Sequence, residues 1–324
     1  MVVTLGMLVA LGAALVLFMR GPVVLRAPPP VARPELSEER LRETVRVLTV
    51  DMHPRDYRHV ENLDRAAGWI AERMRRDGIE VGEQVYTVSG EGTYRNVVAT
   101  QRGSEPGAGV VIVGAHYDAF MGTPGADDNA SGVAVLLELV RTLLPDVPRR
   151  TRQFVAFSTE EPPFFATQDQ GSYRFATDLV SRGEMVHLMV AFDLVGVYSD
   201  ESGSQDYPLP GMSLVYPRRG NFVAVVGDPG AGRWIRLTKR GLLAARALPV
   251  VSFRAPSSLP GVDWSDHLPF RRLGMPGVLV TDTAFMRNPR YHGPDDTMDT
   301  LDFAAMASLV HGMHGVLREA DALR

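Results

Sequence analysis

The chain of 324 residues contains no cysteine. It therefore has no disulfide bond, no zinc–thiolate site and no thiol nucleophile. Any transition metal that it binds must be held by histidine, aspartate and glutamate side chains.

An excess of basic residues is also missing. The net charge is −4 at pH 7, and no basic patch stands out in the sequence. This balance argues against nucleic acid as a partner. The composition, 45% hydrophobic and 22% charged, is that of a globular protein with enough apolar material for one large core or two small ones.

Charge is absent from residues Val2 to Met19 at the N-terminus. As a helix this run would span roughly 27 Å, close to the thickness of a bilayer core. No Lys or Arg precedes the run, and no small-residue cleavage motif follows it closely, which favours an uncleaved membrane anchor over a cleaved signal peptide or a buried helix. The sequence therefore predicts a protein tethered to a membrane through its N-terminal helix.

Three segments follow from this pattern. Residues 1–20 form an anchor or signal segment, residues 21–35 a proline-rich linker, and residues 36–324 the globular domain. Arginines 20, 26 and 33 follow the apolar run, and the positive-inside rule would leave the domain in the cytoplasm. Long domains are translocated despite such charges, so we expect an extracytoplasmic domain, in the periplasm or at the cell surface.

Apolar, strand-like runs alternate with helical patterns throughout the globular part. We expect helices at 36–49, 62–77, 130–144, 171–182, 231–246 and 301–318, and strands at 97–100, 110–114, 153–157, 188–192, 222–226 and 277–281. Most of the strands are continuously apolar, as expected for strands buried on both faces. The pattern predicts the α/β class, as a three-layer αβα sandwich around a central, mostly parallel but mixed sheet.

Side chains that bind metals follow four of these strands. His116 follows the strand at 110–114, the pair Glu160 and Glu161 follows 153–157, Asp193 follows 188–192, and His292 follows 277–281 through a loop. Taken singly, each has an ordinary structural explanation. Because ligands of parallel sheets bind beyond the carboxyl ends of the strands, the combination predicts a metal site at that edge.

A glycine-rich turn lies between the first of these strands and its helix. It reads Gly125-Ala-Asp-Asp-Asn-Ala-Ser-Gly132. Its glycines permit a tight turn that holds an aspartate over the sheet edge, and Asn129 or Ser131 is expected to cap the following helix.

Five motifs occur in a fixed order: Gly114-Ala-His-Tyr-Asp118, the turn 125–132, Ser158-Thr-Glu-Glu161, Phe192-Asp-Leu-Val-Gly196 and Tyr291-His-Gly-Pro-Asp-Asp-Thr297. Together they resemble the ordered motifs of the co-catalytic di-zinc aminopeptidases, a family that also contains glutaminyl cyclases and glutamate-carboxypeptidase-like enzymes. The resemblance covers roughly residues 60–318, and it implies that residues 36–324 are a metallopeptidase catalytic domain with a zinc-aminopeptidase-like fold.

The resemblance also implies roles for single residues. Five would hold two zinc ions per chain: His116, Asp128, Glu161, Asp193 and His292. Asp128 would bridge the two ions, Glu160 would be the general base, and Asp118 would orient His116. Three ligand carboxylates and a bridging hydroxide balance the charge of two divalent cations, and such a pair polarises the scissile carbonyl and activates water. Asp266 is expected to contact Glu160, and His267 to be structural.

Two features depart from the simplest aminopeptidase pattern. Residues Pro162 to Gln170 intervene before Gly171-Ser172, and glutaminyl cyclases, which bind a single zinc, also carry an insertion there. The second is a Gly/Pro/Ser-rich segment, 198–221, expected to lie over the site. Phe164, Phe165 and Tyr198 either shape the substrate pocket or pack the loops on each other.

The sequence thus predicts a zinc-dependent aminopeptidase that hydrolyses the N-terminal residues of peptides through a metal-bridging hydroxide. The alternatives are a glutaminyl-cyclase-like enzyme with one zinc ion, an exopeptidase specific for dipeptides or glutamate, and a catalytically inactive binding module.

Overall fold

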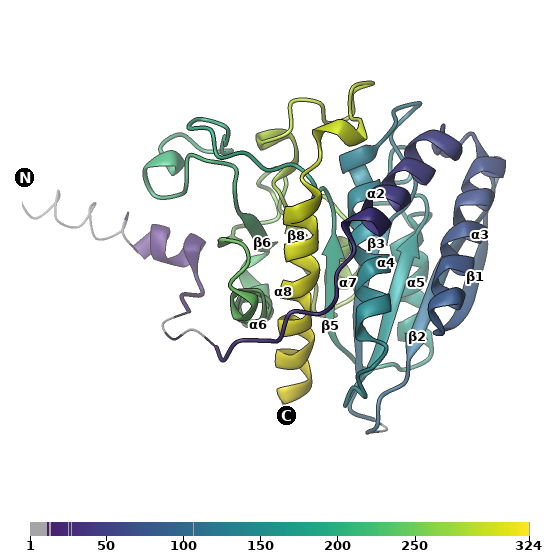
Figure 1. The fold of residues 1–324 in the computed structure, drawn as a ribbon, viewed down its shortest axis with the longest axis horizontal. Helices are drawn as coiled ribbons and strands as arrows, with labels where there is room; N and C mark the ends of the chain where they lie inside the picture. The colour runs from purple at the N-terminus through teal and green to yellow at the C-terminus, as the bar shows by residue number, and fades with distance from the viewer. Residues whose placement is uncertain (1–11, 13, 25, 27, 106, 324) are drawn as a thin grey trace, which may run out of the picture.

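The computed structural model describes residues 12, 14–24, 26, 28–105 and 107–323. Its centre is an eight-stranded mixed sheet (Figure 1). The strands are β1 (Glu80–Val88), β2 (Gly92–Gln101), β3 (Val110–His116), β4 (Thr151–Phe157), β5 (Val186–Phe192), β6 (Val223–Gly227), β7 (Val250–Arg254) and β8 (Val278–Thr281). The helices are α2 (Glu38–Arg46), α3 (Val60–Asp77), α4 (Gly132–Leu143), α5 (Gly171–Ser181), α6 (Gly232–Ala245), α7 (His267–Arg272) and α8 (Phe303–Ala322).

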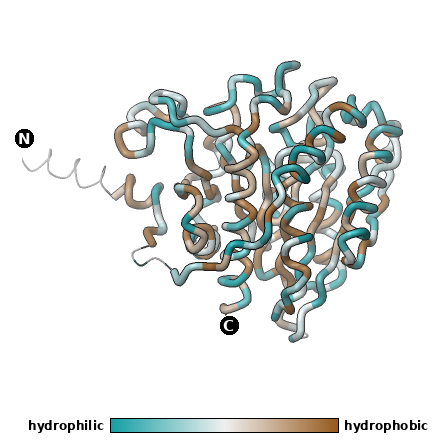
Figure 2. The backbone as a smooth tube through the Cα atoms, viewed as in Figure 1, coloured by the Kyte–Doolittle hydropathy of each residue, from teal (hydrophilic) through white to brown (hydrophobic). Residues whose placement is uncertain are grey.

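Helices cover both faces of the sheet. Helices α3, α4, α8 and α6 pack in sequence on one face with α2 beside α4, and α5 and α7 pack together on the other (Figure 1). Hydrophobic residues concentrate along the central strands and the helices that contact them, whereas the outer loops are largely hydrophilic (Figure 2). The predicted three-layer sandwich with a mixed sheet is confirmed.

The strand order places the edge at which a ligand should bind. It is β1-β2-β4-β3-β5-β8-β6-β7, with β4, β3, β5 and β8 parallel to one another. Strand β3 lies between β4 and β5, so the crossover from β3 to β4 and the following crossover from β4 to β5 run in opposite directions along the sheet. Such a topological switch point opens a crevice at the carboxyl ends of the strands. His116 is the last residue of β3 and lies at this point.

Three elements have no counterpart among the predicted ones. Strand β1 is an edge strand whose side chains are largely exposed, so it lacks the apolar run that marked the inner strands. Strand β7 is the opposite edge, five residues long and mostly half-buried. Helix α7 contains Pro269 and has only six residues. A helix of this length is too short to show helical periodicity in the sequence.

Two predicted helices differ in their bounds. The helix predicted at 36–49 corresponds to α2, but its last three residues belong to a π-helical turn, Val47–Asp51, that follows Arg46. The helix predicted at 301–318 begins at Phe303, after Asp302 accepts a hydrogen bond from the Ala305 N–H as an N-cap, and it runs to Ala322.

The predicted anchor at 2–19 lies mostly outside the described residues, since residues 1–11 and 13 are among those left undescribed. Within the part that the structure describes, no helix has both the length and the apolar character needed to cross a bilayer. The anchor and the domain bounds stay predictions. The described part of the proline-rich linker lies along α6 and α8: the Val31 N–H donates to the Ala244 carbonyl (3.2 Å), and Arg318 donates to the Pro29 carbonyl (2.7 Å).

Candidate metal centre

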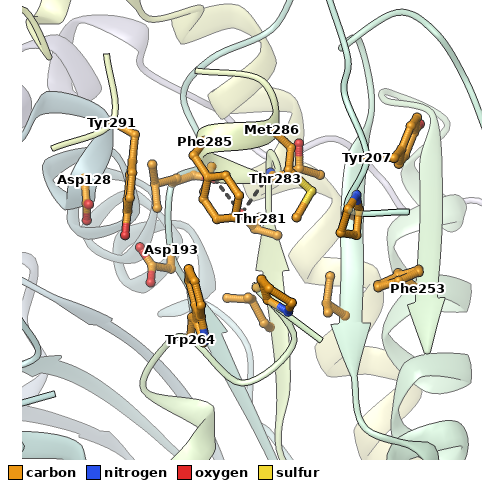
Figure 3. Close-up of a pocket in the computed structure, with 18 of the residues that line it drawn as sticks. Asp128, Asp193, Tyr207, Phe253, Trp264, Thr281, Thr283, Phe285, Met286 and Tyr291 are labelled. Carbon is orange, nitrogen blue, oxygen red and sulfur yellow. Dashed lines mark hydrogen bonds between the residues drawn. The ribbon is translucent and has the colours of Figure 1, made fainter. Parts of the chain in front are cut away.

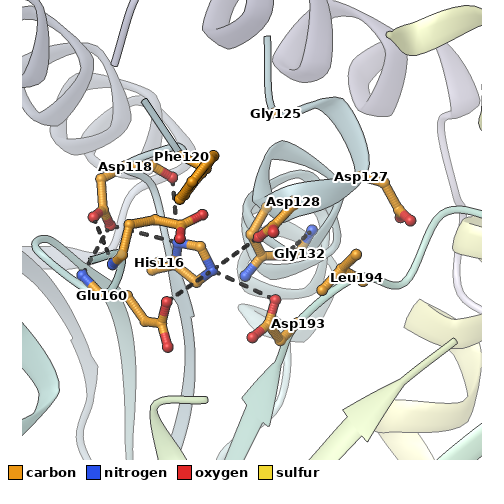
Figure 4. Close-up of polar contacts among 12 residues, drawn as sticks. His116, Asp118, Phe120, Gly125, Asp127, Asp128, Gly132, Glu160, Asp193 and Leu194 are labelled. Carbon is orange, nitrogen blue, oxygen red and sulfur yellow. Dashed lines mark hydrogen bonds and ion pairs between the residues drawn. The ribbon is translucent and has the colours of Figure 1, made fainter. Parts of the chain in front are cut away.

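His116 meets three carboxylates at the switch point. Its Nε2 atom lies 3.4 Å from Asp128 Oδ1, 3.4 Å from Asp193 Oδ1 and 3.8 Å from Glu160 Oε2 (Figure 4). These residues come from the ends of β3, β5 and β4 and from the turn before α4. The predicted crevice therefore brings together side chains that are far apart in the sequence.

His292 contacts the other carboxylate oxygen of the same aspartate. Its Nε2 atom lies 3.2 Å from Asp128 Oδ2 and 3.3 Å from Glu161 Oε2. The two oxygens of Asp128 thus face two different histidines. Each histidine has one further carboxylate near it, Asp193 for His116 and Glu161 for His292.

The charge and hydrogen bonding of this cluster fit divalent cations. Asp128, Glu160, Glu161 and Asp193 are only 4–6% exposed. Glu161 Oε1 and Asp193 Oδ1 have no hydrogen-bond partner among the described residues. Burying several carboxylates without compensating positive charge is costly. Possible ligand atoms of His116, Asp128 and Glu161 all lie within 4.8 Å of one another, and this mixture of imidazole and carboxylate suits zinc.

The cluster holds protons in the absence of a metal. Burial, together with the nearby Asp128 charge, raises the pKa of Glu161 to about 8. Burial alone would lower the pKa of His292, but its contacts with Asp128 and Glu161 outweigh this effect and raise it to about 10. Contacts with His116 and His292 likewise outweigh burial and hold the pKa of Asp128 well below its usual range. A bound cation would therefore displace protons from Glu161 and His292.

We predict that zinc binding releases protons at pH 7 and tightens as the pH rises. Glu161 and His292 are protonated below about 8 and 10, and a metal binds only their deprotonated forms. Isothermal titration calorimetry of the metal-free protein in buffers of different ionisation enthalpy measures the released protons, and chelator competition from pH 6 to 9 measures the affinity. An affinity that does not change over this range would contradict the assignment.

Asp118 connects the histidine to the glutamate pair. Its Oδ1 and Oδ2 atoms accept the backbone N–H groups of Glu160 (3.2 Å) and Glu161 (3.0 Å). His116 Nδ1 lies 3.4 Å from Asp118 Oδ1 and 3.2 Å from the Asp118 carbonyl oxygen. The predicted orientation of His116 by Asp118 stays a prediction, but the structure adds a second contact, which fixes the glutamate pair at the end of β4.

The turn before α4 is held by Asn129. Its Oδ1 atom accepts the Gly132 N–H (3.1 Å) at the start of the helix, whereas the Ser131 hydroxyl bonds to backbone groups outside that first turn. Gly125 has φ +60°, and a Cβ there would lie 2.4 Å from the Asp128 carbonyl oxygen. Glycine is therefore required for this turn to hold Asp128 in the crevice.

The neighbouring aspartate has a structural role. Asp127 turns away from the cluster and accepts hydrogen bonds from the Gly196 N–H and the Asn288 amide, both at 2.9 Å. Asp296 accepts the backbone N–H groups of Asp127 (3.0 Å) and Asp128 (3.1 Å). Asp296 lies in the last of the five motifs, but nothing in the sequence pattern indicates that it anchors the Asp128 turn.

Aromatic stacking positions His292. Its ring lies parallel to Phe120, with centroids 4.0 Å apart and an interplanar angle of 3°, and it also stacks on Tyr291 at 3.8 Å. The backbone of His292 has φ +58°, a conformation that residues other than glycine rarely adopt. The sequence identified the Tyr291-His292 pair, but the part played by Phe120 was not visible in it.

Asp266 and His267 lie at the start of α7. Asp266 is fully buried, and neither of its oxygens has a hydrogen-bond partner in the described part of the chain. After burial, the charges of Asp193 and Asp266 are among the causes that raise the pKa of Glu160, which places Asp266 in its electrostatic surroundings. The His267 ring contacts the Val262 carbonyl oxygen through Nε2 at 2.9 Å and takes no part in the cluster.

The three aromatic residues predicted to shape the pocket or to pack the loops have different positions. Phe165 lines the cavity beside the cluster. Phe164 is buried against Tyr57 and Tyr94, with ring centroids 5.3 and 5.9 Å away, so it packs the inserted loop onto the domain. Tyr198 does not line the cavity. The centroid of its ring lies 5.5 Å from the guanidinium carbon of Arg287.

Arg55, which the sequence did not single out, holds the two ligand-bearing loops together. It is fully buried, and its guanidinium donates to the carbonyls of Tyr117 (2.9 Å), Pro124 (2.9 Å) and Gly125 (3.0 Å), and to that of Leu48. Burial lowers its pKa only to about 10, so it stays charged at neutral pH.

We predict that Arg55→Met destabilises the protein by about 3–5 kcal/mol, because buried carbonyls lose their donors and a buried cation disappears beside the acidic cluster. Arg65→Met, at an exposed position on α3, is the matched control. Urea denaturation of both variants measures the difference. Equal stability of the two would show that Arg55 does not hold the loops.

Comparison with known proteins identifies the family. The model of peptidase family M28 matches residues 96–224 and 235–316, which contain all the residues of the cluster. The chain belongs to peptidase family M28. The predicted family is therefore confirmed, and with it the predicted class of enzyme, a peptidase.

Two relatives illustrate the sequence similarity. The uncharacterized protein YfbL of Escherichia coli (strain K12) is 44% identical over 285 residues, which cover 86% of each chain. A probable leucine aminopeptidase of Trichophyton verrucosum (strain HKI 0517) is 28% identical over 288 residues, covering 84% of this chain and 70% of that protein.

Solved structures share the fold at low sequence identity. BSAP, a zinc aminopeptidase from Bacillus subtilis, superposes with a TM-score of 0.72 at 14% identity, covering 90% of this chain and 97% of that one. A glutaminyl cyclase of Bacteroides thetaiotaomicron gives 0.67 at 16% identity, covering 88% and 99%. These similarities support the fold and do not separate the two activities.

Proposed function

We propose that this protein is an aminopeptidase that uses two zinc ions to remove the N-terminal residue of peptides. The observation that carries the proposal is the position of Asp128, whose two oxygens face two histidines (3.4 and 3.2 Å). Each histidine has a carboxylate of its own, which makes two sets of ligands with one shared member. Membership of a peptidase family and the leucine aminopeptidase among the relatives support the same activity.

The ligand sets follow from the distances. His116, Asp193 and Asp128 Oδ1 would hold one ion, and His292, Glu161 and Asp128 Oδ2 the other. Zinc bound there would polarise the carbonyl of the scissile peptide bond and lower the pKa of a water molecule.

Glu160 is the residue left to move protons. It belongs to neither ligand set, lines the cavity, and is fixed by the bond from its N–H to Asp118. Burial, together with the charges of Asp193 and Asp266, raises its pKa well above the usual range. A carboxylate with a raised pKa can accept a proton from the attacking water and deliver it to the leaving amine.

A glutaminyl-cyclase-like reaction with one zinc ion is the second candidate. The insertion at Pro162–Gln170 favours it, because this segment follows Glu161 directly and places Phe165 in the cavity. In that reaction the substrate's own amine replaces water as the nucleophile. An inactive binding module is not favoured, because all the predicted ligand side chains are present and converge.

We predict that Glu160→Gln retains its zinc and loses about 100-fold or more in kcat on L-leucyl-4-nitroanilide, since proton transfer contributes about 10²–10⁴-fold. Glu184→Gln, at an exposed position, is the control for the charge change. Normal turnover by the Glu160 variant would remove it from the proposed role.

Asp128→Asn is expected to lower the zinc content, because one shared ligand serves both ions. Elemental analysis after dialysis measures the metal, and Asp51→Asn, at an exposed position, is the control. A full zinc complement in the Asp128 variant would refute the shared position.

The reaction products distinguish the aminopeptidase reaction from the cyclase reaction. Incubation of the zinc-loaded protein with leucyl peptides and with peptides that begin with glutamine, followed by mass spectrometry, separates them. We expect a free first amino acid from both peptides. Formation of pyroglutamyl peptide, with no free amino acid, would make the cyclase the correct function.

We also propose that residues 2–19 anchor the enzyme in a membrane with its domain outside the cytoplasm. The support is the charge-free apolar run and its proline-rich continuation. Protease protection in spheroplasts tests the orientation, and a domain that resists added protease until lysis would contradict it.

A further inference from the structure

A cavity of about 400 Å³ adjoins the metal cluster and continues away from it. Asp128 and Asp193 lie at one end, and Tyr207 and Phe253 lie at the other (Figure 3). The zinc chemistry proposed above uses only the first of these ends. The remainder of the cavity is left to bind another part of the substrate.

The floor of the cavity consists of two rows of side chains in register across three strands. Thr281 on β8, Ala224 on β6 and Val251 on β7 are direct partners and form one row. Leu279, Val226 and Phe253 form the second row in the same strand order. All six line the cavity. Because β5 carries Asp193 beside β8, the floor extends three strand spacings from the cluster, about 14 Å.

The space exists because no long α-helix covers this half of the sheet face in the described part of the chain, where the end of the N-terminal helix reaches only the far edge through Met19. Helices α5 and α7 cover the same face beside β2 and β5. Over β8, β6 and β7 the cover consists of loops, which contribute Pro208, Met212 and Tyr216 from one side and Phe285 and Met286 from the other. Loops with large side chains cannot fill the volume that a packed helix would occupy.

The charge distribution in the cavity is one-sided. The ionisable carboxylates and imidazoles that line it, namely Asp128, Glu160, Glu161, Asp193 and His292, all belong to the cluster. The far half is lined by aliphatic and aromatic side chains with a few hydroxyl groups. Such a cavity fits a ligand with one polar end and one long apolar group.

The far end is closed by a wall that the N-terminal segment supports from outside. Met19 packs against Met212 and Tyr216, which line the cavity. The Arg254 guanidinium lies 3.9 Å from the centroid of the Phe18 ring, and the Ser252 hydroxyl donates to the Arg20 carbonyl (2.7 Å). The last residues of the predicted anchor segment, Phe18 to Arg20, thus pack against the edge strand β7 and against two residues that line the far end of the cavity.

We propose that this cavity binds the side chain of the peptide's first residue and that it selects long apolar side chains, well beyond the size of leucine. The proposal rests on the aminopeptidase function proposed above. A leucine side chain reaches about 4 Å from its Cα atom, whereas the floor runs for about 14 Å, which suits a bulky aromatic group or an unbranched chain of roughly eight carbon atoms.

The apolar lining sets the size of the effect. Each further methylene that leaves water for this cavity should raise kcat/KM about threefold to fourfold, until the chain meets the wall at Met212 and Tyr216. The gain applies to the transition state as well as to the substrate, because the side chain stays bound through the reaction.

The test is a series of 4-nitroanilides of alanine, norvaline, leucine, norleucine, 2-aminooctanoic acid and 2-aminodecanoic acid, assayed with the zinc-loaded full chain. We expect kcat/KM to be about tenfold above leucine at 2-aminooctanoate and to rise further at 2-aminodecanoate, whose side chain has eight carbon atoms. A maximum at leucine with poor cleavage of the longer substrates would overturn the proposal while leaving the aminopeptidase function intact. Cleavage of none of the substrates would instead overturn the function itself.

Variants locate the binding site. Ala224→Phe places a ring in the middle of the floor and should lower the ratio of kcat/KM for 2-aminooctanoate over norvaline at least tenfold. Val225→Ile, whose side chain lies on the opposite face of β6, is the matched control and should keep the ratio. Val251→Phe, at a half-buried position in the same row, replaces the first variant if that one does not fold. An unchanged ratio in a folded variant would show that long side chains bind elsewhere.

Discussion

The contact of Asp128 with two histidines is the constraint on which the rest of this site depends. One buried carboxylate reaches Nε2 of His116 and Nε2 of His292 through its two oxygens. Three further carboxylates converge on the same point, and their charge must be compensated by bound protons or by cations. Zinc fits that requirement, and the proposed pair of ions would share Asp128.

Keeping such a cluster in place requires a rigid polar frame, which the surrounding loops supply. Arg55 binds the carbonyls of the loops that carry His116 and Asp128, and Asp296 binds the N–H groups of the Asp128 turn. Asp118 fixes the N–H groups of the glutamate pair. Each of these groups is a buried polar side chain that bonds to backbone atoms, so each fixes the path of the chain while leaving the ligand atoms free.

The topology explains why chemistry and substrate space adjoin. The metal cluster lies at the switch point at β3, and the sheet continues past it through β8 and β6 to the edge strand β7. Loops, not helices, cover that continuation on one face. The same sheet therefore supplies the ligands at its centre and an apolar floor beside them.

The sequence predicted what depends on local pattern. Continuous apolar runs located the inner strands, and the side chains at their ends, such as Asp193, located the crevice. Strands β1 and β7 were not predicted, because an edge strand needs no continuous run of apolar residues. Arg55 and Phe120 were not predicted, because their roles arise from contacts between residues 62 or more positions apart. These contacts are Arg55 with Tyr117 and Phe120 with His292, and no local sequence pattern indicates them.

The most direct test of the central claim is a crystal structure of the zinc-loaded protein with anomalous scattering recorded at the zinc absorption edge. If Asp128 bridges two zinc ions, two anomalous peaks lie on either side of it, one beside His116 and Asp193 and the other beside His292 and Glu161. A single peak beside His292, with His116 bound to protein groups alone, would contradict this bridging role.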